Sequence, residues 1–165
     1  MAVFPHVFDP KELTSEQANR TPLRRSTATD VHTRFASVPL FSECSKKELK
    51  LLAKTAIVES RAAGAEVVTE GEPGSSAYVV LQGSCVVVRD GHAVGEIGTG
   101  GVVGELSLLT RAPRNATVVA QSPLEIAILD RRDFFALLES SPSISIKLLQ
   151  SLATRLQALD SGPVT

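Results

Sequence analysis

The chain has 165 residues, a length typical of one domain with an appended arm. Hydrophobic residues make up 43% of it, which is enough for a core and excludes disorder throughout. With 17 basic residues against 18 acidic ones, the formal net charge is −1, so nucleic-acid binding through bulk electrostatics is not expected. No apolar run approaches the roughly 18 residues of a membrane span. The N-terminus lacks the features of a signal peptide, and two cysteines are too few for a disulfide framework, so a cytoplasmic location is expected.

The first part of the chain predicts an arm followed by helices. Residues 1–27 are polar without a strong period, which is typical of a flexible arm, and the main domain is expected over 28–160, with a tail at 161–165. Helical spacing of apolar residues runs from Val31 to Ala53, and Pro39 interrupts it. Ser45 and Glu48 have the spacing of a capping box and predict a new helix start.

Between Thr55 and Asp130 the apolar period falls to two, and short β-rich runs alternate with glycine turns. The expected runs are Ala56–Val58, Glu66–Thr69, Ala77–Leu81, Cys85–Val88, Ala93–Ile97, Val102–Val103, Ala116–Ala120 and Leu124–Leu129. About eight strands at this spacing predict an antiparallel β-roll or jelly-roll barrel. With helices at both ends, the fold class is α+β.

Two helices are predicted after the strands. Asp130 is the expected cap of the first, and Ser141 with Pro142 begins the second. The second helix carries a wide apolar stripe: Ile144, Leu148, Leu149, Leu152, Leu156 and Leu159. Such a stripe has to cover the barrel, a ligand or another helix, so a homodimer through this helix is one expectation.

The segment from Gly104 to Thr117 breaks the strand pattern and carries the chemistry. Glycines lead into a short helical turn at Glu105, and a strand is expected to begin at Arg114. Glycine permits close approach of backbone N–H groups to an anion, and an arginine adds a permanently charged bidentate donor. Glu105 is able to accept from hydroxyls. Together these residues predict a site that binds a phosphate beside a sugar hydroxyl, which is the arrangement found in a nucleotide.

On these residues the chain resembles the cyclic nucleotide-binding domain of the kinase regulatory subunit and catabolite activator protein type. The resemblance covers about Val31 to Leu159, and its most specific part is the phosphate-binding cassette, Gly104 to Thr117. The family's glycine-punctuated hairpin is matched by Gly71, Gly74, Tyr78 and Gly83. Ser75 departs from the family, which often has aspartate there.

The resemblance implies a role for each matching residue. Arg114 pairs with the phosphate oxygens, Glu105 accepts from the ribose 2′-hydroxyl, and Asn115 and Ala116 lie near the phosphate and base. The implied ligand-binding set is Val103, Gly104, Glu105, Leu106, Ser107, Arg114, Asn115 and Ala116. The implied lid over the base comes from Leu152, Arg155, Leu156 and Leu159 of the last helix.

The function expected from these features is a non-catalytic receptor for cAMP, with cGMP second, that switches its C-terminal helix to signal to a downstream protein. No cofactor is expected. In the family, threonine after the phosphate-binding arginine goes with cGMP and alanine with cAMP, whereas this chain has Asn115.

Three alternatives stay open. The first is an enzyme on a cupin-like barrel, with or without a metal, although His6, His32 and His92 are scattered and no metal or catalytic set is expected. The second is a fragment of a larger cyclic-nucleotide-regulated protein. The third is a transcription regulator, which is disfavoured because only residues 160–165 follow the last helix, so direct DNA binding is not expected.

Overall fold

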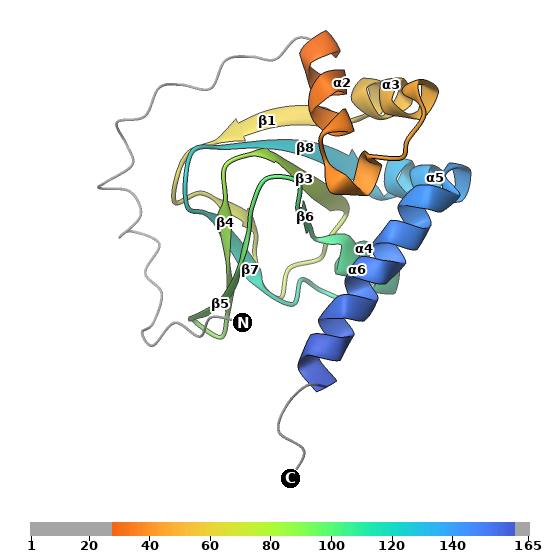
Figure 1. The fold of residues 1–165 in the computed structure, drawn as a ribbon. Coiled ribbons are helices and arrows are strands. Elements are labelled where there is room, and N and C mark those ends of the chain that lie inside the picture. The colour runs from red at the N-terminus through yellow and green to blue at the C-terminus, as the bar shows by residue number, and fades with distance from the viewer. Residues whose placement is uncertain (1–27, 161–165) are drawn as a thin grey trace.

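The computed structural model describes residues 28–160. The predicted arm (1–27) and tail (161–165) lie outside the described residues. The strands form two four-stranded antiparallel sheets, with orders β1-β8-β3-β6 and β2-β7-β4-β5 (Figure 1). Their bounds are β1 Ile57–Arg61, β2 Glu66–Val68, β3 Ser76–Gln82, β4 Cys85–Arg89, β5 His92–Ile97, β6 Val102–Val103, β7 Thr117–Ala120 and β8 Leu124–Asp130. The predicted eight-stranded roll with flanking helices is therefore confirmed.

Two of the helices, α3 and α5, begin at side-chain caps that the sequence predicts. Their bounds are α2 Ala28–Ala36, η2 Pro39–Phe41, α3 Lys46–Thr55, α4 Glu105–Thr110, α5 Arg131–Ser140 and α6 Pro142–Asp160. Ser45 and Glu48 form the predicted capping box at α3, and the Asp130 carboxylate accepts from the backbone N–H of Asp133 at α5. As predicted, Pro39 stands where the first helical segment is interrupted.

Several predicted strand ends differ from the structure by one to three residues, and the start of the strand after the cassette is the difference that bears on the site. The strand after the cassette begins at Thr117 and not at Arg114. The backbone N–H and C=O of Arg114 instead bond to Glu72 O and Gly71 N, both at 2.8 Å. These bonds tie residue 114 to the loop before β3, so it is unable to join the ladder of β7.

Two hydrophobic clusters hold the roll and its helices together. Between the sheets, Val80, Leu124 and Ile126 are completely buried. A second cluster joins the helices to the sheet that contains β3 and β8, with Phe35, Phe41, Phe134, Ile144 and Leu148 among its buried members. Figure 1 accordingly shows the helices gathered on one side of the roll.

Helix α6 is buried along only part of its length. Ile144 and Leu148, near its beginning, are 1% and 6% exposed, whereas Leu149 and Leu156 are 65% and 63% exposed. The wide stripe expected from the sequence is thus only partly covered by the roll. No helix within residues 28–160 combines the length and apolar character that crossing a membrane requires.

Candidate functional site

The cassette, residues 104–117, leaves β6 through a turn that only glycine makes without strain. Gly104 has φ +83°, in the left-handed region. A Cβ atom there would collide with the guanidinium of Arg114 and lie 3.2 Å from Ser76 O. The glycine therefore provides both the turn into α4 and the space that Arg114 occupies.

Arg114 lies at the centre of the site. It is 7% exposed, and it donates from Nη1 to Gly104 O and from Nη2 to Ser76 O, both at 2.8 Å. The Tyr78 ring lies 5.8 Å from its Cζ, within the range of a cation–π contact. Among residues 28–160, no carboxylate forms an ion pair with Arg114. A buried guanidinium whose charge has only carbonyl and ring partners is a strong site for an anion.

Gly74 packs directly against this guanidinium. A Cβ atom at residue 74 would lie 2.5 Å from Cζ of Arg114 and 2.8 Å from Cβ of Ser107. Such distances are sterically forbidden, so any side chain at residue 74 would push Arg114 away from its position. The loop before β3 therefore sets where the charge of Arg114 lies.

Glu105 is the buried acid of the site. Its residue is 2% exposed, and one oxygen accepts from Nη1 of Arg155 at 2.5 Å. Arg155 belongs to α6, which passes beside α4 in Figure 1. The family resemblance implies that Glu105 binds the ribose and that the last helix forms the lid. In this structure Glu105 is paired with Arg155 of that helix.

The rest of the predicted ligand-binding set lies around these two residues. Val103, Ser107 and Ala116 are buried, Gly104 and Leu106 are half-buried, and Asn115 is exposed. The C=O of Asn115 accepts from Nε of Arg89 at 3.0 Å, which fixes the backbone beside Arg114.

The predicted lid residues are differently placed. Leu152 is half-buried, and Leu156 is 63% exposed, so Leu156 is not a core residue in this structure. Arg155 reaches the cassette through Glu105. The side chain of Leu159 lies outside the described part of the chain.

The sequence did not predict the contributions of Gly74 and Ser76. Both act through backbone geometry, Gly74 by having no side chain and Ser76 by its carbonyl oxygen. The glycines of the segment 71–74 were the available signal, but they do not show what the loop packs against. Within residues 28–160, no group of three or more His, Cys, Asp or Glu residues is arranged to hold a metal ion.

Comparison with known proteins gives the family of the chain. The profile described as "Cyclic nucleotide-binding domain" matches residues 58–141, which include the loop before β3, the whole cassette and α5. The chain therefore belongs to the cyclic nucleotide-binding domain family.

Relatives include enzymes and channels. Over 94 residues the chain is 40% identical to the cGMP-dependent protein kinase egl-4 of Caenorhabditis briggsae, covering 52% of this chain and 13% of that protein. Over 110 residues it is 34% identical to the cyclic nucleotide-gated potassium channel mll3241 of Mesorhizobium japonicum, covering 67% of this chain and 30% of that protein. The chain thus spans less than a third of the length of either.

Among solved structures, cAMP-bound PfPKA-R is similar with a TM-score of 0.73 and 26% identity. The match covers 81% of this chain and 46% of that one. The chain therefore shares its fold with that structure over most of its length.

Proposed function

We propose that the chain is a non-catalytic receptor for a cyclic nucleotide, with cAMP preferred over cGMP. The observation that carries the proposal is the buried guanidinium of Arg114, which has no ion-pair partner within residues 28–160. A cyclic phosphate carries one negative charge and two exocyclic oxygens, which suit one arginine fork together with the backbone N–H groups of Leu106 and Ser107.

The second carboxylate oxygen of Glu105 supports a role for this residue in binding the ribose. Its carboxylate is buried beside the cassette, and it has a second oxygen besides the one that Arg155 contacts. A carboxylate accepts at both oxygens, so Glu105 is able to take a sugar hydroxyl as well. In this proposal the 2′-hydroxyl of the nucleotide binds Glu105, and Val103, Gly104, Asn115 and Ala116 complete the surroundings of the ligand.

The same pairing supports a route for the signal. Because Arg155 belongs to α6, a ligand at Glu105 changes the electrostatic environment of this helix directly. We propose that α6 then closes over the base, with Leu152 and Leu156 as candidates for the lid, and that a partner protein recognises the new surface.

The exposed leucines on α6 favour a homodimer, in which a second copy of the chain is the partner that binds this helix. Leu149 and Leu156 are both more than half exposed, and their spacing of seven places them on the same side of the helix. Sedimentation of wild type and the Leu149→Gln/Leu156→Gln variant tests this proposal. A dimer in wild type alone supports it, and a monomer mass at all concentrations for wild type, with and without cAMP, overturns it.

Calorimetric titration with cAMP, cGMP and 2′-deoxy-cAMP tests the receptor itself. We expect a Kd for cAMP in the micromolar range or tighter, equivalent to about 8 kcal/mol or more. Wild type is expected to bind 2′-deoxy-cAMP more weakly than cAMP, and this difference should disappear in Glu105→Ala, which removes both acceptor oxygens. Absence of binding to either cyclic nucleotide at millimolar concentration would contradict the proposal.

A further inference from the structure

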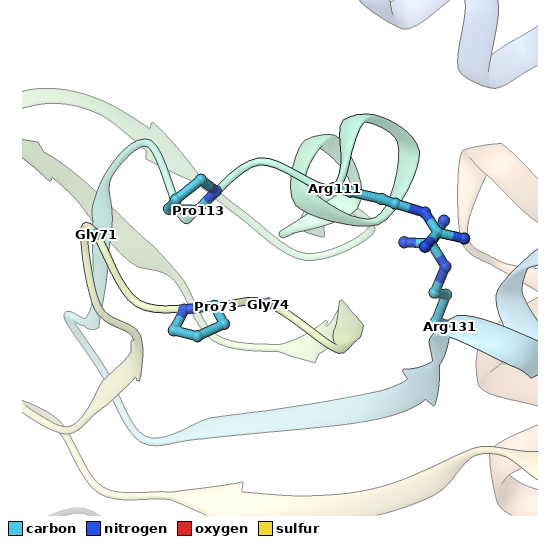
Figure 2. A pocket seen from close by; sticks show the side chains of 6 residues that line it. All are labelled: Gly71, Pro73, Gly74, Arg111, Pro113 and Arg131. Carbon is cyan, nitrogen blue, oxygen red and sulfur yellow. The ribbon is translucent and has the colours of Figure 1, made fainter.

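A second basic site is a pocket beside the loop before β3. A cavity of about 430 Å³ is lined by Gly71, Pro73, Gly74, Arg111, Pro113 and Arg131, and we call it the arginine pocket. Its lining comes from the loop before β3, the end of the cassette and the start of α5 (Figure 2). These are three separate segments of the chain.

Backbone hydrogen bonds hold the three segments in place. Gly71 N donates to Arg114 O at 2.8 Å and Arg114 N donates to Glu72 O at 2.8 Å, which joins the loop to the cassette. Arg131 N donates to Ser75 O at 2.9 Å, which joins the loop to α5. These bonds fix the backbone of the loop relative to Arg114 and to the start of α5.

Two arginine side chains converge on this pocket. Figure 2 shows Arg111 and Arg131 extending toward one another from different elements. The guanidinium of Arg131 lies over the Phe135 ring, with Cζ 4.9 Å from its centroid, and this contact orients it. Within residues 28–160, neither arginine forms an ion pair, although Asp130 and Asp133 are near Arg131 in sequence and Glu72 lies between Gly71 and Pro73 in the loop. Two positively charged side chains that line one pocket without an ion-pairing carboxylate favour an anion that contacts both.

The backbone of Arg111 supports a role for its side chain. Arg111 ends α4 in the left-handed region, with φ +58°, where glycine is the residue that fits without strain. Arginine is unfavourable at this position on local grounds alone. An arginine at this position is explained if its guanidinium binds a ligand.

From this geometry we infer that the arginine pocket binds a phosphate monoester, at a site separate from that of the cyclic nucleotide. A phosphate monoester carries a charge of about −1.5 to −2 near pH 7 and three acceptor oxygens, which match two guanidinium groups. A carboxylate or a cyclic phosphodiester carries one charge and needs only one arginine. The prolines at residues 73 and 113 offer no N–H donor, so they suit the carbon portion of the ester.

Titrations followed by amide NMR test the inference with defined probes. Glycerol 3-phosphate and acetyl-phosphoserine amide present the same monoester on a metabolite and on a peptide, and acetyl-serine amide and acetyl-aspartate amide are the matched controls. We expect saturable shifts centred on Gly71 and Gly74 with one or both esters, and saturating cAMP should not displace them. Binding of only one ester identifies the source of the phosphate. Shifts with neither ester, equal binding of the aspartate probe, or displacement by cAMP would each overturn the inference.

Variants of each arginine separate a binding role from a structural one. Arg111→Gly and Arg131→Gln should each weaken ester binding by about tenfold, or about 1.4 kcal/mol. Arg132→Gln is the matched control, since Arg132 is exposed and does not line the pocket, and it should keep the wild-type affinity. Arg111→Gly should also raise the Tm because it relieves the positive φ. Unchanged ester affinity in Arg111→Gly, or equal loss in Arg132→Gln, would refute the assignment.

Discussion

Arg155, in the second half of α6, is paired with Glu105, the first residue of α4, across 50 positions of sequence. The carboxylate side chain is 3% exposed and the arginine side chain 49% exposed, so the arginine bridges solvent and the interior of the cassette. No other ion pair within residues 28–160 connects α6 to the cassette.

Arg155→Gln should therefore loosen α6 and destabilise the fold. The substitution leaves a buried carboxylate without its charged partner, which costs about 1–3 kcal/mol, and the exposure of Arg155 places the expected loss near the lower end. Hydrogen exchange should accelerate at residues 150–158, with Arg132→Gln as the control. Exchange equal to that of wild type would show that α6 is held by its apolar contacts alone.

Arg114→Lys should abolish most cyclic-nucleotide binding while keeping the charge. Lysine is unable to donate to Gly104 O and Ser76 O and to a phosphate at once, because it lacks the planar fork of arginine. We expect the Kd for cAMP to rise about 30-fold or more, equivalent to about 2 kcal/mol or more. Calorimetry on this variant and on Arg132→Lys measures the difference. Equal affinities of the two variants would place the phosphate elsewhere.

Gly74→Ala should impair the same site without touching a charged group. The new methyl would lie 2.5 Å from Cζ of Arg114, so the guanidinium has to move. We expect a loss of about 1–3 kcal/mol in the free energy of unfolding, typical of overpacking, together with weaker cAMP binding. Gly98→Ala is the matched control, since a Cβ there meets nothing within 4 Å. Chemical denaturation and titration of both variants give the comparison.

Asn115→Thr should shift base preference toward cGMP, and Asn115→Ala should shift it toward cAMP. A threonine hydroxyl at this position is able to accept from the guanine 2-amino group, whereas alanine removes the acceptor. Asn115 is exposed, so the expected change in relative affinity is about 0.5–1.5 kcal/mol. Competition titrations of the three proteins measure it. Tighter binding of cGMP than cAMP by wild type would reverse the proposed preference.

Cys85 should make stability fall in alkaline solution. Burial raises the pKa of its thiol from 9.0 to about 11, so the folded protein keeps a proton that the unfolded chain loses. The unfolded state therefore binds fewer protons between about pH 9 and 11, and the free energy of unfolding decreases as the pH rises through that window. Denaturation of wild type and Cys85→Ala at several pH values tests this. The decrease should be steeper in wild type, and parallel curves would contradict the role of Cys85.

The strands and the cassette were predictable because their signals are local. Alternating apolar residues and turn glycines predict all eight strands, and the caps at Ser45 and Asp130 predict two helix starts. Glu105 and Arg114 were identifiable because the cassette is continuous in sequence. Periodicity was insufficient to predict which part of α6 is buried, since the same apolar pattern includes the buried Ile144 and the exposed Leu156.

The contacts that define the site were not predictable. Arg114 bonds to Ser76 O, 38 positions away, and a carbonyl oxygen is present at every residue, so no side chain indicates this partner. Arg155 was expected over the base as part of a lid, but whether it reaches Glu105 depends on the angle at which α6 crosses α4. Ile144 and Leu148 pack α6 into the buried cluster, and no local motif encodes where this packing brings the rest of the helix.

The shared cluster links the helices before β1 to the helices after β8. Ile144 and Leu148 of α6 belong to the same buried cluster as Phe35 of α2 and Phe41 of η2. Lys147 adds a donor from α6 to Pro39 O at 3.0 Å. A rotation of α6 that breaks the contact at Glu105 therefore has to be accommodated by the helices that precede β1. If α6 moves on ligand binding as proposed, α2 and η2 are the elements whose packing would change with it, because all three share this cluster.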